Sequence, residues 1–479
     1  MKEYELVVGM EIHAQLLTKT KFFCSCPSRF GDAPNTNTCP VCLSHPGTLP
    51  VINKAAIEKV IKAGVAFNCT INPVSIFARK NYFYPDLPKG YQISQYESPI
   101  CSDGYFEILT KNGEMKKIRI RRIHLEEDAG KLMHENFRNS SLVDLNRAGT
   151  PLMEMVTEPD FSSSDEVHDF LTQLRRILRY LNVCDGNMEE GSLRCEPNIS
   201  IRPPGTSELG VKVELKNINS FKAAKRGIEH EYRRQVLSLD MGEKLLQQTR
   251  GWDDNKGESF LMRVKEDAHD YRYFPDPDLL PLKVPQSLTD TVKASMEELP
   301  EARKRRLIND FGLQENDADV ICSEKSYAAY FEETASQCGD SKMAANWFMG
   351  EILRVLKTES DLASFPIQPA RLAALVRMIR NSSISGTIAK KVFEIMLTKS
   401  DSPENIVADH GLSVIGDDSA ILQAVSEIIT EFPDQVSQYV SGKDKVFGFI
   451  IGQAMRKMKG KADPAKLNQI MKNELEKRR

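Results

Sequence analysis

The stretch Val7-Val-Gly-Met-Glu-Ile-His-Ala-Gln-Leu16 decides how the first part of the chain is interpreted. Its apolar and polar side chains alternate, which is typical of a β-strand with one buried face. The apolar face would pack into a core, while Glu11, His13 and Gln15 would share the opposite face. A carboxylate and an imidazole that point the same way from a strand indicate a metal or phosphate site.

Other strand-like segments repeat this placement of charge. Glu126, Glu127 and Asp128 follow a strand-like run, and Glu154 stands alone within the apolar run 151–156. A buried carboxylate without a partner costs roughly several kcal/mol, so Glu154 needs a cation. Two further segments place alternate polar side chains on one face: Arg194, Glu196, Asn198, Ser200 and Arg202 in the first, and Lys212, Glu214 and Lys216 in the second.

Each of these segments alone is more often an exposed strand face or a salt-bridged acid. Five of them in one region together predict a cage that holds divalent metal ions for nucleotide phosphates. The sequence has no G-x-x-x-x-G-K-[ST] phosphate loop, no G-x-G-x-x-G fingerprint and no G-x-S-x-G elbow. ATP chemistry would therefore run through Mg²⁺ that carboxylates hold.

Four cysteines form a separate signal. Cys24 and Cys26 are followed, after twelve intervening residues, by Cys39 and Cys42, and the loop between them is rich in Gly, Pro and Asn. Four thiolates at this spacing can fill the tetrahedral shell of one zinc ion, which leaves no open position and makes the site structural. Unrelated buried cysteines are the alternative, and a redox pair lacks the βαβ context that it needs.

Composition and charge narrow the class of protein. The 479 residues suggest two to four domains, and 41% hydrophobic with 27% charged residues are typical of a globular protein. No uncharged apolar run reaches the ~18 residues of a membrane span, and the N-terminus lacks a signal-peptide core. The ten cysteines are too scattered for a disulfide framework, which predicts a reducing cytoplasm.

The pattern along the chain predicts an α+β fold that is followed by helices. Short β-like runs fill the first ~290 residues, with helical patterns at 55–67, 164–181 and 221–241. Because strands and helices do not alternate strictly, we expect a mixed or antiparallel sheet. After Pro300 we expect helices at 301–311, 317–338, 341–357, 368–379, 387–398, 403–410, 418–431, 433–441, 447–458 and 464–476.

The predicted domains are 1–292, 293–400 and 401–479. The C-terminal part of the last predicted domain, residues 441–479, carries a net charge of +7, so the remainder of the chain carries −10. A basic helical end on an acidic body is typical of a protein that binds a polyanion, although the same lysines can simply solvate a helix.

Several long motifs occur in order along nearly the whole chain. They are Val8-Gly-Met-Glu-Ile-His13, Arg79-Lys-Asn-Tyr-Phe-Tyr-Pro-Asp86, Gly90-Tyr-Gln-Ile-Ser-Gln95, His124-Leu-Glu-Glu-Asp-Ala-Gly-Lys131, Ser141-Leu-Val-Asp-Leu-Asn-Arg147, Met188-Glu-Glu-Gly-Ser-Leu-Arg-Cys195, Glu214-Leu-Lys-Asn217 and Asp270-Tyr-Arg-Tyr-Phe-Pro-Asp276. These motifs resemble one family, that of the B subunit of the aspartyl/glutamyl-tRNA(Asn/Gln) amidotransferase.

This resemblance implies a glutamine-synthetase-like cradle domain, a helical domain and a small tail domain that contacts tRNA. It implies a heterotrimer with the amidase (A) and small (C) subunits. It also implies that ATP phosphorylates the side-chain carboxylate of glutamate on tRNA(Gln) or aspartate on tRNA(Asn), and that ammonia from the amidase then displaces phosphate. Some family members lack the four cysteines, so zinc would support the local fold and not the chemistry.

The resemblance also implies roles for single residues. A permanent Mg²⁺ would be held by His13, Glu127 and Glu154, and strand parity leaves Glu126 open as a ligand in place of Glu127. Lys80 lies where the family guards the mouth of an ammonia channel. The second, ATP-associated Mg²⁺ and the nucleotide would be bound by Glu11, Glu196, Glu214, Ser192 and Arg194, and weaker candidates at the channel are Lys89 and Tyr82.

Two other functions fit part of the sequence. A non-catalytic scaffold that docks tRNA would need only the basic tail. A paralogous complex restricted to tRNA(Gln), with an asparaginase-type ammonia source, has an inserted domain in its large subunit. The continuous run from the β-rich part into the helices leaves no room for that insertion.

Overall fold

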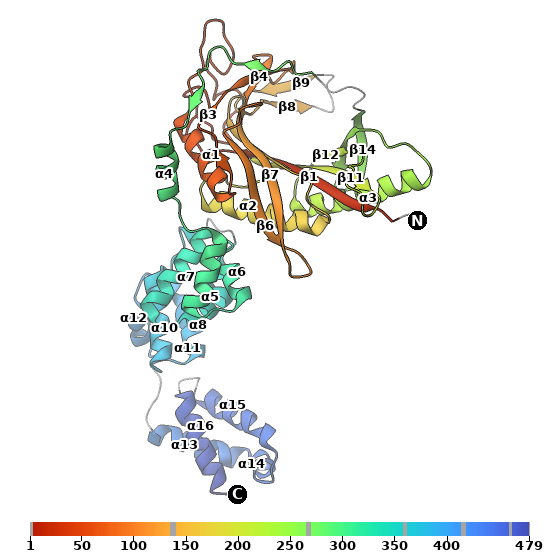
Figure 1. The fold of residues 1–479 in the computed structure, drawn as a ribbon. Coiled ribbons are helices and arrows are strands. Elements are labelled where there is room, and N and C mark those ends of the chain that lie inside the picture. Colours follow the sequence, from red (N-terminus) through yellow and green to blue (C-terminus); the bar gives the residue numbers. More distant parts are fainter. Residues whose placement is uncertain are drawn as a thin grey trace. The chain divides into compact units, whose positions relative to one another are not determined.

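The computed structural model describes residues 3–134, 140–264, 270–357, 362–412, 418–458 and 462–478. They form two compact units, Met1–Leu299 and Pro300–Arg479 (Figure 1). The first unit holds all of the strands among these residues, and the second is helical. This arrangement confirms the predicted α+β fold with helices after it.

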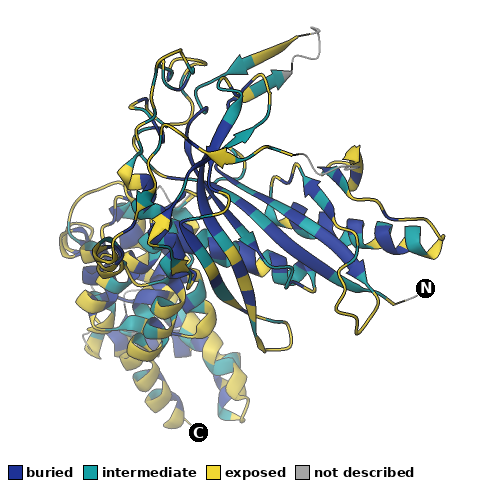
Figure 2. Ribbon diagram, turned by 45° about the horizontal axis from the view of Figure 1, so that its top comes forward, coloured by how far each residue is buried: buried dark blue, intermediate teal, exposed yellow. Residues whose placement is uncertain are grey.

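A nine-stranded sheet forms the centre of the first unit, and its neighbouring strands are antiparallel except for one parallel pair, β12 and β13. The central strands carry the most buried residues (Figure 2). In sheet order the strands are β14 (Glu258–Val264), β13 (Gln248–Asp253), β12 (Val213–Lys216), β11 (Leu193–Arg202), β1 (Glu5–Gln15), β10 (Pro151–Thr157), β7 (Met115–Glu127), β6 (Cys101–Leu109) and β2 (Thr70–Ile71).

Three helices pack against this sheet, and each begins at a side-chain cap. They are α1 (Lys54–Ala66), α2 (Ser164–Tyr180) and α3 (Phe221–Asp240). Asn53, Ser163 and Ser220 accept hydrogen bonds from backbone N–H groups of the first helical turns, which would otherwise lack partners. The buried faces of these helices and the apolar faces of the strands form one hydrophobic core.

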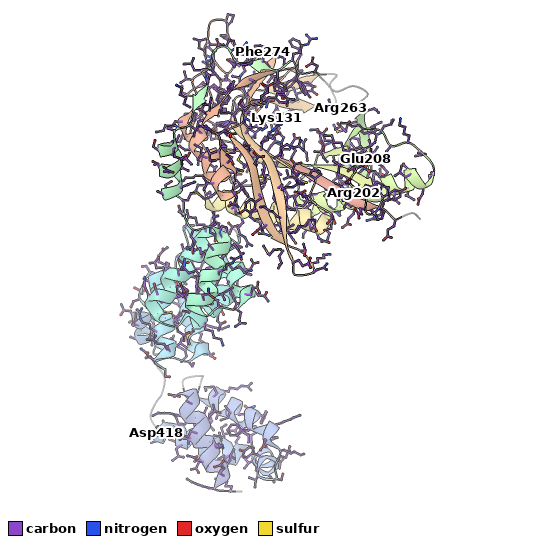
Figure 3. The ribbon with its side chains drawn as sticks, in the orientation of Figure 1. Lys131, Arg202, Glu208, Arg263, Phe274 and Asp418 are labelled. Carbon is purple, nitrogen blue, oxygen red and sulfur yellow. The ribbon has the colours of Figure 1, made fainter. Side chains whose placement is uncertain are left out.

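Three small sheets and one helix complete the first unit. Lys131 on β8 and Phe274 on β15 lie far from Arg202 and Glu208, at another end of the unit (Figure 3). The elements are β3 (Val74–Ser75), β4 (Ala78–Asn81), β5 (Tyr91–Ser94), β8 (Lys131–His134), β9 (Ser141–Asp144), β15 (Phe274–Pro275), β16 (Leu282–Lys283) and α4 (Gln286–Ala294); the sheets are β15-β4-β5, β16-β3 and β8-β9.

The second unit contains two hydrophobic clusters, one over residues 307–407 and one over 421–475. None of its described helices, nor any in the first unit, is long and apolar enough to cross a lipid bilayer. Its helical elements are α5 (Pro300–Phe311), α6 (Glu315–Ile321), α7 (Lys325–Cys338), α8 (Ser341–Trp347), η1 (Phe348–Ile352), α9 (Leu353–Val355), α10 (Pro369–Arg380), α11 (Gly386–Met396), α12 (Pro403–Asp409), α13 (Asp418–Glu431), α14 (Pro433–Val440), η3 (Asp444–Val446), α15 (Phe447–Lys457) and α16 (Pro464–Glu476).

Two predicted helices differ from the structure. The helix expected over 317–338 is interrupted after α6. There the Cys322 and Ser323 N–H groups donate to carbonyls of the last turn, and the helix ends. The helix expected over 341–357 contains the π-helical turn η1 between α8 and α9. In both cases the apolar spacing continues across the break, so periodicity alone does not reveal it.

The domain boundaries drawn from the sequence at 292/293 and 400/401 remain predictions. In the structure, Met296 and Leu299 still pack against the first core, and the first compact unit runs to Leu299. Ile406 and Val407 of α12 belong to the cluster over residues 307–407. These contacts favour boundaries a few residues later than those expected.

The packing of the first core predicts how much the free energy of unfolding falls when a buried ring is removed. Phe170 is fully buried, and its ring centroid lies 5.1 Å from that of Phe161. Phe170→Ala should lower the free energy of unfolding by about 3–5 kcal/mol, because the removed ring leaves unfilled space. We would measure urea unfolding through Trp252 fluorescence in a Trp347→Phe background. The matched control is Phe83→Ala, since Phe83 is 94% exposed, and equal losses for both would contradict the prediction.

Candidate functional site

The register of the central sheet brings the charged residues of separate strands onto one face. His13 on β1 lies opposite Glu154 on β10 and opposite Arg194 on β11. Glu11 lies opposite Glu196 in the same pairing. Directly opposed residues point to the same side of a sheet, so a single polar face collects these side chains.

His13 is the centre of this group. Its Nε2 lies 3.4 Å from Glu154 Oε2, 3.6 Å from Glu126 Oε1 and 3.7 Å from Glu11 Oε1. Glu126 and Glu154 are buried, although both are carboxylates. Oxygen and imidazole ligands that converge in this way suit a divalent cation, and Glu11, His13 and Glu154 lie close enough to share one.

His124 belongs to the site but was not predicted from the sequence. His124 is on β7, where it lies opposite Glu154 of β10. Its Nε2 is 3.4 Å from Glu154 Oε2 and 3.7 Å from Glu126 Oε2. Its side chain is buried. The signal was present in the sequence, because residues 124 and 126 are two apart on a strand and therefore share a face.

Glu127 does not join this group. It is the neighbour of Glu126 on β7, so its side chain points to the other face of the strand. There its Oε1 accepts hydrogen bonds from the Lys89 ammonium and from the Ile93 N–H at 2.9 Å. The expected ligand set of His13, Glu127 and Glu154 stays a prediction; in the structure Glu126 lies beside His13, whereas Glu127 pairs with Lys89.

The expected second set is held together by a lysine. Lys216 Nζ lies 2.5 Å from Glu196 Oε2 and 3.0 Å from Glu214 Oε1. Thr249 Oγ1 also donates to Glu214. Glu196 and Glu214 thus converge on one cation, and Glu11 lies opposite Glu196 across the β1–β11 pair.

The buried charges shift one another's proton affinities. Burial disfavours the charged form of His13, but the hydrogen bond and charge of Glu154 outweigh it and raise the His13 pKa to about 9. Burial likewise disfavours an ionised Glu154, but His124 and His13 hold its pKa well below the usual range. Burial, helped by the Glu154 charge, raises the pKa of Glu11 to about 7. The buried carboxylates therefore depend on positive charge, which protonated His13 and His124 supply here.

The other expected site residues lie at different places. Lys80 on β4 is half-buried. Desolvation opposes its charge, yet Glu126 and Glu154 raise its pKa above the usual range. Its Nζ lies 5.1 Å from the centroid of the Tyr271 ring. Burial raises the pKa of Tyr82. Lys80 is thus within electrostatic reach of the acidic group.

Ser192 and Arg194 make hydrogen bonds that position loops. Ser192 Oγ donates to Asp185 and to the Asn187 carbonyl, so it is engaged within its own loop. Arg194 donates to Asp128 Oδ2 at 2.9 Å. Arg194 also lies opposite His13, which leaves it next to the acidic face.

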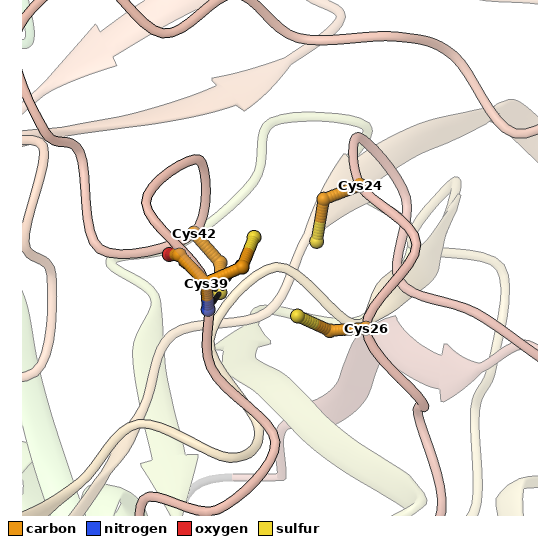
Figure 4. A group of neighbouring side chains, drawn as sticks. All are labelled: Cys24, Cys26, Cys39 and Cys42. Atoms are coloured by element: carbon orange, nitrogen blue, oxygen red, sulfur yellow. Dashed lines mark hydrogen bonds between the residues drawn. The ribbon is translucent and has the colours of Figure 1, made fainter.

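The four cysteines converge from two loops (Figure 4). Their sulfur atoms all lie within 4.8 Å of one another, and the Cys39 and Cys42 sulfurs are 3.9 Å apart. Sulfurs at the corners of a tetrahedron with a zinc–sulfur bond of about 2.3 Å are roughly 3.8 Å apart, so the group fits zinc. The hydrogen bond from Cys24 lowers the pKa of Cys42 to about 4. We call Cys24, Cys26, Cys39 and Cys42 the four-cysteine cluster.

A cavity of about 230 Å³ lies beside the four-cysteine cluster. Its lining includes Cys24 and Cys42 of the cluster together with Lys89 and Glu127.

Comparison with known proteins identifies relatives along the whole chain. Residues 6–290 match the family described as the GatB/GatE catalytic domain, and residues 329–475 match the family described as the GatB domain. A protein of Caldicellulosiruptor bescii is 50% identical over 479 residues, which cover 99% of this chain and 100% of the relative. A protein of Geobacter sulfurreducens is 50% identical over 98% of this chain and 99% of its own length. Both are named as the B subunit of aspartyl/glutamyl-tRNA(Asn/Gln) amidotransferase.

The two adjacent glutamates on β7 allow a matched test of the metal ligand. Glu126→Gln should weaken Mn²⁺ binding to the full chain by roughly tenfold or more, because it replaces the negatively charged carboxylate beside His13 with a neutral amide. Glu127→Gln should change it much less, because that carboxylate binds Lys89. Electron paramagnetic resonance of free Mn²⁺ measures both, and the reverse order of effects would refute the assignment.

The four-cysteine cluster predicts one zinc ion per chain. Purified full-length protein should contain about one zinc, and Cys39→Ser should lose it because three thiolates bind more weakly than four. Inductively coupled plasma mass spectrometry measures the ratio. Cys338→Ser, a buried cysteine in α7, serves as the control and should keep zinc. Zinc-free wild-type protein, grown with zinc in the medium, would rule the site out.

Proposed function

Since this chain belongs to the family of the B subunit of aspartyl/glutamyl-tRNA(Asn/Gln) amidotransferase, we propose that its acidic face is the site where the substrate carboxylate is activated. The protein is one component of a multi-subunit, ATP-dependent enzyme that transamidates misacylated Glu-tRNA(Gln) and Asp-tRNA(Asn). The observation that carries the proposal is the convergence of Glu11, Glu126 and Glu154 on His13.

The chemistry explains why such a face is needed. A carboxylate at neutral pH resists attack by ammonia, because its negative charge repels a nucleophile and its oxygen is a poor leaving group. We propose that an oxygen of the substrate side chain attacks the γ-phosphorus of ATP, and ADP leaves. Ammonia then attacks the acyl carbon of the mixed anhydride, inorganic phosphate leaves, and the nitrogen loses a proton to give the amide.

The acidic face would hold two metal ions for this reaction. His13, Glu126 and Glu154 would bind one Mg²⁺, with His124 holding the two carboxylates in place. The ATP-associated Mg²⁺ would be bound by Glu11, Glu196 and Glu214, and Lys216 would release the last two as the ion binds. Bound Mg²⁺ supplies charge neutralisation on the phosphate oxygens, which is the main demand of phosphoryl transfer.

Other residues would position the reactants. Lys80 lies within electrostatic reach of Glu126, so its ammonium can orient the carbonyl oxygen of the substrate or a phosphate oxygen. Through the family resemblance, Lys80, with Lys89 and Tyr82, would also lie where ammonia enters. Arg194 would contribute to nucleotide binding from its position opposite His13, whereas the hydrogen bonds of Ser192 favour a role in shaping the loop.

The remaining parts of the proposal concern partners and location. Ammonia would come from the amidase partner, and a small third protein would complete a heterotrimer. The segment 441–479 would contact tRNA through its positive charge, although Lys457 and Lys466 pair with acidic residues of α13 and residues 459–461 lie outside the described part. A cytoplasmic location is supported by the ten cysteines, none of which is in a disulfide.

The activation step is tested by Glu154→Ala in the complex with the amidase and the small third protein. Amide formation on Glu-tRNA(Gln) should fall to background, because loss of this carboxylate leaves His13 and His124 without their shared anion. tRNA affinity should stay within about twofold, since contact with the tRNA backbone depends on other basic residues. The assay uses ammonium chloride as nitrogen donor and follows ATP hydrolysis in parallel.

The control variant is Glu107→Ala, because Glu107 is exposed on β6. It should behave as wild type. Full amide formation by Glu154→Ala would show that the chemistry occurs elsewhere. Tight tRNA binding by the wild-type complex without ATP hydrolysis, under all conditions, would favour a scaffold.

A further inference from the structure

Lys21 is a buried cation that the proposed reaction does not use. Its side chain is fully buried, in a short segment that precedes the first two cysteines. Moving an ammonium from water into a protein interior costs several kcal/mol by rough estimate unless an anion or strong acceptors compensate it. The neighbours of its Nζ therefore show what this residue holds in place.

Two acceptors contact the Lys21 ammonium. One is the Cys42 sulfur at 3.6 Å, and the other is the Leu145 carbonyl oxygen at 3.2 Å. Within the described part of the chain, no carboxylate forms an ion pair with Lys21. A thiolate at Cys42 is therefore the anion that those residues offer it within hydrogen-bonding distance.

Leu145 belongs to the segment 143–149, which comprises the last two residues of β9 and most of its connection to β10. The cysteine-bearing loop contacts this segment directly: Asn35 Nδ2 donates to the Val143 carbonyl, and the Asn37 N–H donates to Asn146 Oδ1. The Leu145 N–H in turn donates to Asn35 Oδ1. The loop that carries the cysteines and the 143–149 segment thus form one hydrogen-bonded unit, with Lys21 beneath it.

The far end of the segment contacts residues 127–130, which follow Glu126 in the chain. Arg147 donates to the Ala129 and Gly130 carbonyls, and the Gly149 N–H donates to the Asp128 carbonyl. A Cβ atom at Gly149 would lie 3.7 Å from Lys21 Cδ and 3.8 Å from Glu127 Oε2. The positive φ of Gly149, 84°, lets the backbone pass through this narrow place.

We propose that Lys21 is a positioning residue that fastens the four-cysteine cluster to the 143–149 segment. Its ammonium compensates one thiolate of the cluster and at the same time binds the Leu145 carbonyl. Four thiolates around one Zn²⁺ carry a net charge of −2, so a buried cation against one sulfur stabilises the loaded site. Zinc retention and the position of the 143–149 segment then depend on the same residue.

This inference rests on the proposed zinc ion and not on transamidation, so the two fail separately. The test compares wild-type full chain with Lys21→Met, which keeps the length of the side chain and removes the charge. Lys19→Met is the matched control, because Lys19 is exposed in the same segment. Three quantities are measured: zinc content, the rate of zinc transfer to a chromogenic chelator, and hydrogen exchange of backbone amides in residues 143–149.

The expected result is distinct for each variant. Lys21→Met should release zinc roughly tenfold to a hundredfold faster, as is typical when a group that supports a metal ligand is lost. Its 143–149 amides should exchange faster, while Lys19→Met should match wild type in all three quantities. A lower melting temperature with unchanged zinc release and unchanged exchange would mean that Lys21 only fills space, and the proposal would be wrong.

A second measurement covers the case in which Lys21→Met does not fold. Zinc is removed from wild-type protein with a chelator, and exchange is followed in the same segment. The 143–149 amides should become exposed together with zinc loss, because the cluster and the segment share Lys21. Unchanged exchange after zinc removal, or wild-type protein that contains no zinc, would overturn the proposal, while amide formation by the wild-type complex would leave the proposed function intact.

Discussion

The pairing of β1 with its two neighbours is the constraint on which the rest of the structure depends. β1 lies between β10 and β11, and its register sets His13 opposite both Glu154 and Arg194. A shift of one residue would turn the apolar face of β1, with Ile12 at 0% exposure, toward the polar side. The hydrophobic core therefore holds the register, and the register assembles the acidic face.

Cations compensate the buried carboxylates of this face throughout. Glu154 lies between His13 and His124, and Glu196 and Glu214 share Lys216. Each carboxylate keeps a partner, which limits the free-energy cost of burying charge. In the proposed reaction, metal ions would take the place of protons and of the lysine, because the oxygens are already directed at common points. In the four-cysteine cluster, the Lys21 ammonium likewise contacts the Cys42 sulfur.

Residues whose assignment the sequence leaves open show most clearly what the structure adds. Alternation within single strands predicted the faces of β1 and β11 correctly, because the period of two is a local property of the backbone. It left Glu126 and Glu127 unresolved, since the end of β7 was not visible from the sequence. β7 extends through Glu127, and its pairing with β10 directs Glu126 to the face of His13. His124 was missed although it stands two residues before Glu126 and shares its face, because the choice between Glu126 and Glu127 was itself left open.

By itself, the sequence determined the family, the α+β architecture with helices after it, the cysteine spacing and the presence of acids on strand-like segments. These are features of local periodicity and of motifs, which need no knowledge of strand order. The tertiary structure alone decided which residues meet: His124 with Glu154, Lys216 with Glu196, and Lys21 with both Cys42 and Leu145. Such contacts join residues far apart in the chain, and they exist only because burial of the apolar faces brings their strands and loops into register.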